Sequence, residues 1–107
     1  MTSGIELQRC PACAKVWAFP RRRCPACGGE PERFEASGRA TLFAATVVTR
    51  APDETFRALV PYRIALADLE EGPRIMAHLS AEAEIGAPLR GRVEEIAGRP
   101  IPLFKPA

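Results

Sequence analysis

Four cysteines in two closely spaced pairs constrain the fold of this chain more than any other feature. The sequence reads Cys-Pro-Ala-Cys at residues 10–13 and again at residues 24–27, and the chain contains no other cysteine. A C-x2-C turn supplies two thiolate ligands, and two such turns complete a tetrahedral metal site. The sequence therefore predicts a zinc ribbon with a structural metal. The expected ligands are Cys10, Cys13, Cys24 and Cys27.

Other uses of the four cysteines fit the sequence less well. The first residues do not resemble a signal peptide, so we expect a reducing cytoplasm, where disulfides are rare. A redox C-x-x-C motif is expected singly and near a βαβ pattern, which is missing here. Iron bound by the same four cysteines is the main alternative to zinc. A structural site uses all four ligands and leaves no open position for water, so we expect no catalysis at the metal.

The composition is that of a small globular chain. At 107 residues and 11.6 kDa it has room for one domain, or for one domain with a small appended module. Hydrophobic residues make up 47% and charged residues 26%, an ordinary mix for a folded protein. No apolar run approaches the ~20 residues that a membrane span needs. We therefore expect no membrane partner.

Positive charge is concentrated between the cysteine pairs. The segment between Glu6 and Glu30 holds five basic residues and no acidic one, whereas the chain from Ala40 onward has a net charge of −1. Two explanations stay open. The cations offset the formal charge of −2 on a four-thiolate zinc site, or the run Arg21–Arg23 contacts a phosphate-bearing ligand or an acidic partner.

Alternating and β-branched segments predict a mainly β fold. In the first part we expect Trp17 and Phe19 to line one face of a ribbon hairpin as core residues. After residue 37 the pattern predicts five strands, a polar loop at residues 51–55 and one helical turn at residues 81–84. The expected strands are residues 41–49, 62–69, 74–79, 89–96 and 101–104.

Five short strands without a long helix favour a closed barrel, because closure removes exposed strand edges. We predict a zinc ribbon with a short lead-in over residues 1–36, followed by a five-stranded OB-fold over residues 37–107. An SH3-like barrel or an open sandwich also fits the pattern.

These segments resemble a known family in which a rubredoxin-like zinc ribbon precedes a C-terminal OB-fold. Its members are accessory subunits of thiolase-type or hydratase-type acyl-CoA enzymes. The resemblance covers nearly all of residues 8–107 and rests on motifs that occur in the family's order. They are Arg9-Cys-Pro-Ala-Cys13, Arg23-Cys-Pro-Ala-Cys-Gly28, Ser37-Gly-Arg-Ala-Thr-Leu42, Pro61-Tyr-Arg-Ile-Ala-Leu66, Leu69-Glu-Glu-Gly-Pro-Arg74, Ile85-Gly-Ala-Pro-Leu89 and Pro102-Leu-Phe-Lys-Pro106.

Two features depart from the family pattern. Only nine residues precede the first cysteine, where members commonly carry a longer helical extension. The first knuckle is followed by Ala14, where glycine is usual, so this turn lacks the residue that adopts positive φ most easily. The family fixes no catalytic residue of its own.

The residues also argue against a standalone enzyme. All cysteines are assigned to the metal, the single histidine is His78 in a strand, and no serine has a base nearby in sequence. We therefore predict a non-catalytic accessory subunit that binds an acyl-CoA enzyme of the thiolase superfamily and helps hold or channel its CoA substrate. The chain has 13 arginines and two lysines, and guanidinium groups suit the phosphates of CoA or acyl-CoA. The expected contacts are Arg21, Arg22 and Arg23.

Two alternatives accompany this prediction. The partner is instead a hot-dog-fold enoyl-CoA hydratase, or the protein binds single-stranded nucleic acid through its OB-fold. Nucleic-acid sites interleave aromatic and basic residues, and the few aromatics after residue 37 do not lie among arginines. We consider nucleic acid the weaker alternative. The loop over residues 50–61 is a candidate to cover the pantetheine arm or to contact the enzyme.

Overall fold

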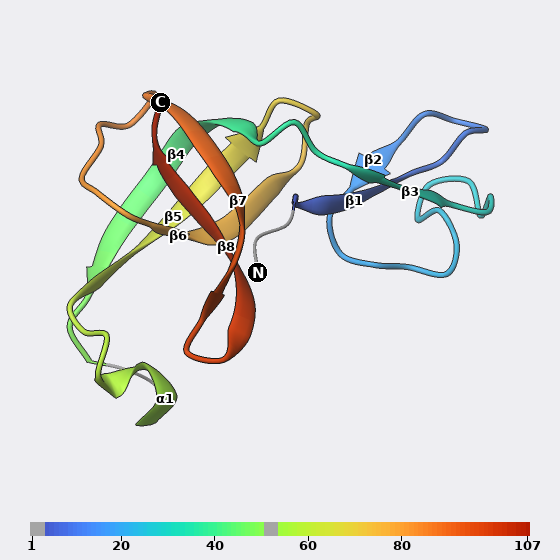
Figure 1. The fold of residues 1–107 in the computed structure, drawn as a ribbon. Helices are drawn as coiled ribbons and strands as arrows, with labels where there is room; N and C mark the ends of the chain where they lie inside the picture. The colour runs from blue at the N-terminus through green and yellow to red at the C-terminus, as the bar shows by residue number, and fades with distance from the viewer. Residues whose placement is uncertain (1–3, 51–53) are drawn as a thin grey trace.

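The computed structural model describes residues 4–50 and 54–107, which form a small sheet joined to a barrel (Figure 1). The sheet contains β1 (Glu6–Arg9), β2 (Val16–Trp17) and β3 (Glu32–Glu35). We call this sheet and the two cysteine turns together the ribbon. All its pairings are antiparallel, in the order β2-β1-β3. The ribbon projects from one side of the barrel, so the molecule is elongated, 44 × 29 × 23 Å.

Five strands close the barrel in the order β4-β5-β6-β8-β7. All neighbours are antiparallel except β6 and β8, and β4 completes the ring by pairing with β7. This is the five-stranded Greek-key barrel of an OB-fold, which confirms the predicted fold class. The strands are β4 (Arg39–Val48), β5 (Tyr62–Leu69), β6 (Arg74–Leu79), β7 (Pro88–Ile96) and β8 (Arg99–Pro106). The division at residues 36 and 37 stays a prediction.

The predicted helical turn at residues 81–84 is wrong. The backbone of Leu42 holds the following loop against β4 instead: its N–H donates to the Ala87 carbonyl and its C=O accepts from the Gly86 N–H, at 3.0 and 2.7 Å. A short helix, α1 (Glu54–Arg57), lies where the sequence predicted a polar loop. Residues 51–53 of that loop lie outside the described residues.

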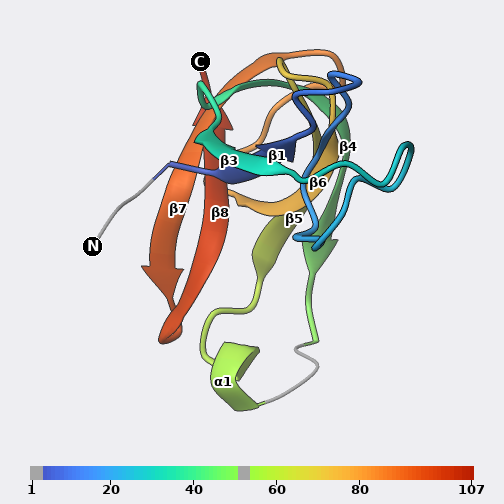
Figure 2. The same cartoon turned by 90° about the vertical axis from the view of Figure 1, so that its right-hand side faces the viewer.

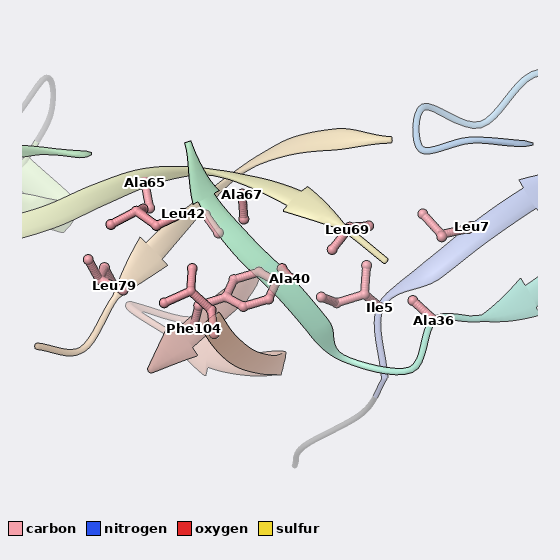
Figure 3. Packing of buried hydrophobic residues seen from close by; sticks show 12 residues of the cluster. Ile5, Leu7, Ala36, Ala40, Leu42, Ala65, Ala67, Leu69, Leu79 and Phe104 are labelled. Atoms are coloured by element: carbon pink, nitrogen blue, oxygen red, sulfur yellow. The ribbon is translucent and has the colours of Figure 1, made fainter. Parts of the chain in front are cut away.

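One hydrophobic core joins the ribbon to the barrel (Figure 3). Ile5, Leu7 and Ala36 from the ribbon belong to the same buried cluster as Leu69 and the barrel interior. Small side chains on β5 and β6 leave space inside the barrel for the ring of Phe104 and the leucines of neighbouring strands. Because the core is continuous, the stability of the ribbon is coupled to that of the barrel.

Helix α1 lies at the end of the barrel opposite the C-terminus (Figure 2). Its buried Phe56 contacts the rings of Tyr62 and His78, each at 5.9 Å between centroids, and those two rings stack on each other at 5.0 Å. Within the described residues, no helix is long and apolar enough to cross a membrane.

Candidate functional site

The two cysteine turns have the same backbone hydrogen bonds. In the first, the Cys10 N–H donates to the Lys15 carbonyl at 2.9 Å, and the Ala14 N–H donates to the Cys10 carbonyl at 2.7 Å. In the second, the Cys24 N–H donates to the Gly29 carbonyl at 2.8 Å, and the Gly28 N–H donates to the Cys24 carbonyl at 2.9 Å. The repeated Cys-Pro-Ala-Cys sequence therefore folds into two equivalent knuckles.

The knuckles bring all four predicted ligands together. Their sulfur atoms lie within 4.8 Å of one another, with 3.5 Å between Cys10 and Cys27 and 3.6 Å between Cys13 and Cys24. A tetrahedral zinc with metal–sulfur bonds of about 2.3 Å requires sulfurs separated by roughly 3.8 Å. Cys10 and Cys24 are buried, and Cys13 and Cys27 are exposed at the tips of the turns. The cluster fits a structural metal.

The pKa values of the cysteine thiols also favour a bound cation among the four sulfur atoms. Burial raises the pKa of Cys24, but hydrogen bonds from the backbone N–H groups of Cys27 and Ala26, together with those from the thiols of Cys13 and Cys27, lower the pKa to about 6. The Gly29 N–H lowers the pKa of Cys27, but the neighbouring thiols of Cys10 and Cys13 raise it to about 12. Four thiolates cannot share this volume without a compensating charge, which a divalent metal supplies.

Gly29 leaves space for the sulfurs. A Cβ atom added at this residue would lie 3.0 Å from the Cys10 sulfur and 3.4 Å from the Cys27 sulfur. Both distances are short for contacts with sulfur, so a side chain here would push the ligands apart. Glycine at this residue therefore keeps the cage compact.

Ala14 adopts the backbone conformation that its knuckle requires despite its side chain. Its φ is +65°, close to the +76° of Gly28 at the equivalent point of the second knuckle. A non-glycine residue in this region costs about 1–2 kcal/mol. The departure from the family pattern is therefore accommodated by local strain.

We expect Ala14→Gly to stabilise the protein. Glycine removes the left-handed strain but gains backbone freedom in the unfolded chain, so the net gain is about 0.5–1 kcal/mol. Urea unfolding of the metal-loaded protein measures it. Ala12→Gly, at an exposed alanine of the same turn without positive φ, is the matched control and should destabilise slightly. A loss of stability in Ala14→Gly would contradict the inference that the backbone at Ala14 is strained.

A buried glutamine, which the sequence analysis missed, fixes the loop between the knuckles. Gln8 is 7% exposed. Its Oε1 accepts from the Trp17 Nε1 at 2.6 Å and from the Arg21 backbone N–H at 2.7 Å, and its Nε2 donates to the Arg21 carbonyl at 3.2 Å. One side chain thus holds both polar groups of the Arg21 backbone. A single polar residue in a strand gives no pattern from which this role could be inferred.

The loop that Gln8 fixes presents Phe19 and Arg21–Arg23 to solvent; we call residues 19–23 the ribbon tip. Trp17 is buried, as predicted, but Phe19 is 81% exposed, so the prediction that it is a core residue is wrong. The chain turns after β2 ends at Trp17, and the alternation does not continue. Among the described residues, no acidic side chain pairs with the three arginines, whereas Arg9 pairs with Glu32 at 2.6 Å.

His78 and Ser37, for which the sequence analysis predicted no catalytic role, make structural contacts. His78 is partly buried against Tyr62, and burial lowers its pKa. The Ser37 hydroxyl donates to Glu70 at 2.8 Å and its backbone N–H donates to Glu71 at 2.7 Å, so these groups tie the start of β4 to the β5–β6 turn. None of these contacts forms a nucleophile–base pair.

Comparison with known proteins places this architecture in a family. The sequence profile described as "ChsH2, C-terminal OB-fold domain" matches residues 34–94, more than half of the chain. The chain belongs to the DUF35/ChsH2 family. A solved structure named "Ltp2-ChsH2(DUF35) aldolase" aligns over 96% of this chain and 84% of that chain, with 31% identity and a TM-score of 0.80.

Curated relatives in the family are longer proteins. A DUF35 domain-containing scaffold protein of Pyrococcus furiosus is 42% identical over 64 residues, 58% of this chain and 46% of that protein. A probable enoyl-CoA hydratase alpha subunit of Thermomonospora curvata is 33% identical over 109 residues, 96% of this chain and 34% of that protein. The chain thus spans about a third to half of the length of these relatives. A DUF35 protein from Sulfolobus solfataricus shares the fold, with a TM-score of 0.63 at 16% identity.

Proposed function

We propose that this DUF35/ChsH2 protein is a non-catalytic accessory subunit that docks on an acyl-CoA enzyme of the thiolase superfamily and helps hold its CoA substrate. The alignment with the chain from the Ltp2–ChsH2(DUF35) aldolase over 96% of this chain carries the proposal. The word "scaffold" in the names of archaeal relatives supports it. The isolated chain is expected to show no turnover of acyl-CoA esters.

We propose zinc as the metal of the four-cysteine cluster, with iron as the alternative. Four thiolates at tetrahedral spacing suit zinc, and they fill its coordination sphere. When bound, the metal supplies positive charge and a rigid cross-link between the knuckles rather than an open coordination site. The residues that would hold it are Cys10, Cys13, Cys24 and Cys27.

We propose that the ribbon tip contacts the phosphates of CoA or the surface of the partner enzyme. Gln8 and the two knuckles hold the backbone of this loop from both sides, which lowers the entropy that binding would otherwise cost. An exposed aromatic beside arginines that have no acidic partner among the described residues has the composition of an interface hot spot. Both features favour recognition over simple charge balance.

Replacing two arginines of the tip tests this assignment. Charge-assisted contacts to phosphate or carboxylate contribute about 1.5–3 kcal/mol each. Arg21→Ala/Arg22→Ala should therefore weaken binding of CoA, or of the partner enzyme, at least tenfold, as measured by calorimetry at two salt concentrations with metal content checked. Arg33→Ala/Arg57→Ala removes the same charge from two other exposed sites and is the control. Equal loss of affinity in the two double variants would mean that the ribbon tip contributes only general positive charge and makes no specific contact.

The hydratase relative favours a second partner class. Almost all of this chain aligns with one third of the probable enoyl-CoA hydratase alpha subunit. A hot-dog-fold enoyl-CoA hydratase is therefore the alternative partner. Co-expression with a thiolase-type aldolase or with a hydratase, followed by size-exclusion chromatography, decides between them, and a failure to co-elute with either would contradict the accessory role.

A further inference from the structure

The outer face of β7 and β8 forms a groove lined by cations, and none of its lining residues belongs to the ribbon tip. We call it the basic groove. It encloses a volume of about 400 Å³, enough for a small organic ligand. Its residues are Ser37, Gly38, Ser80, Arg90, Gly91, Arg92, Glu94, Leu103, Phe104 and Lys105.

The register of the barrel places like charges directly opposite one another in this groove and at its edge, where Arg39 lies outside the lining. Arg90 on β7 pairs with Lys105 on β8 and, on its other side, with Arg39 at the start of β4. Directly opposite residues in antiparallel strands share a face, with Cβ atoms about 4.5–5.5 Å apart. Arg92, two residues along β7, lies on the same face. Four cations thus lie on one face of three neighbouring strands.

Acidic groups compensate only part of this charge. Arg92 pairs with Glu94 at 3.1 Å, and Arg39 lies 3.9 Å from a Glu70 oxygen. Arg90 and Lys105 have no acidic partner among the residues that the structure describes. Like charges directly opposite each other destabilise a sheet. Arg90 and Lys105, at the centre of the four cations, therefore repel each other, and an anion bound between them would attract both.

We propose that the basic groove binds the phosphate or pyrophosphate group of a small organic molecule. A phosphate dianion can bridge Arg90 and Lys105, whereas a carboxylate offers one charge and two oxygens to the same pair. The exposed Ser80, at the rim beside β8, offers a hydroxyl to a third phosphate oxygen. Half-buried Leu103 offers an apolar surface to the organic part. The proposal does not rest on the partner enzyme.

Titration with inorganic pyrophosphate tests the groove directly. In the ¹⁵N-labelled 107-residue protein loaded with metal, we expect amide shifts at Ser80, Arg90, Arg92 and Lys105. Arg90→Gln/Lys105→Gln should weaken pyrophosphate binding at least tenfold. Without the anion it should be at least as stable to heat as the wild type, because it relieves the repulsion. Arg33→Gln/Arg57→Gln removes the same charge from two exposed sites outside the groove and should change the affinity less than twofold.

Four results would overturn the proposal. Absent shifts would mean that the groove does not bind pyrophosphate, and equal weakening in both double variants would mean only a general attraction of the anion to positive charge. Tighter binding of a dT oligonucleotide than of pyrophosphate, lost in the groove variant, would mean a nucleic-acid surface instead. Loss of groove binding together with loss of thermal stability in Arg90→Gln/Lys105→Gln would mean a structural role for the two cations.

CoA as a second probe separates this inference from the proposed function. Weaker CoA binding in the groove variant but not in the ribbon-tip variant would support the groove and contradict the assignment of CoA phosphates to Arg21–Arg23. If pyrophosphate binds in the groove but the protein binds no acyl-CoA enzyme, the proposed function is contradicted and the proposal of a phosphate site in the groove is supported.

Discussion

Cys24→Ser is expected to lose the metal and to unfold the ribbon. Cys24 is a buried residue of the proposed metal site, and its sulfur accepts from the Ala26 N–H at 3.4 Å, so the substitution replaces both a soft candidate ligand and an ordered hydrogen-bond acceptor. Structural zinc binding contributes about 10–16 kcal/mol in small metal-dependent folds. Elemental analysis should give about one zinc per native chain and markedly less in the variant.

The loss should extend beyond the ribbon. Ile5 and Leu7 belong to the same core as Leu69 and Phe104, so an unfolded ribbon exposes one end of the barrel core and lowers the melting temperature of the whole molecule. Ala26→Ser, an exposed residue of the same turn that is not a ligand, is the matched control and should keep its metal. Full metal content with an unchanged melting temperature in Cys24→Ser would contradict a four-ligand site.

Much of the fold could be predicted because its strongest features are local. The C-x2-C spacing alone brings two sulfurs together. The alternation in residues 62–69 and the turn that follows them predicted β5 and its partner strand β6 at their observed bounds. The helical turn predicted at residues 81–84 was wrong because hydrogen bonds of Gly86 and Ala87 with Leu42, which is distant in the sequence, fix that loop. Local pattern contains no information about such a contact.

The site was predicted only where its residues are close in sequence. Phe19 continued the alternation of a strand that ends two residues earlier, so its exposure could not be inferred. The net charge of −1 after residue 40 concealed the basic groove. Arg39, Arg90 and Lys105 become neighbours only through the register of three strands. Charge counted along the chain cannot detect a cluster that pairing across strands creates.

Phe104→Ala is expected to produce the largest loss of stability among substitutions in the barrel core. Phe104 lies on β8, between β7 and β6, and its side chain is buried in the barrel core, the largest fully buried side chain among the described residues. Truncating a buried phenylalanine costs about 3–5 kcal/mol, because the transfer free energy is lost and a cavity remains. Urea unfolding of the metal-loaded protein measures the difference in free energy, provided that the m-value stays constant.

The strand beside Phe104 gives the cavity little means of closing. Gly91 lies directly opposite Phe104, and a Cβ atom at Gly91 would overlap the ring. The glycine thus creates the space that the ring fills. Phe104→Ala would place two small residues opposite each other, so the loss of unfolding free energy should fall toward the upper end of the 3–5 kcal/mol range, about 5 kcal/mol. Phe43→Ala is the control: this exposed ring lies outside the barrel under the Arg74 guanidinium, and its loss should cost about 1 kcal/mol or less. Similar losses in the two variants would mean that Phe104 does not anchor the barrel core.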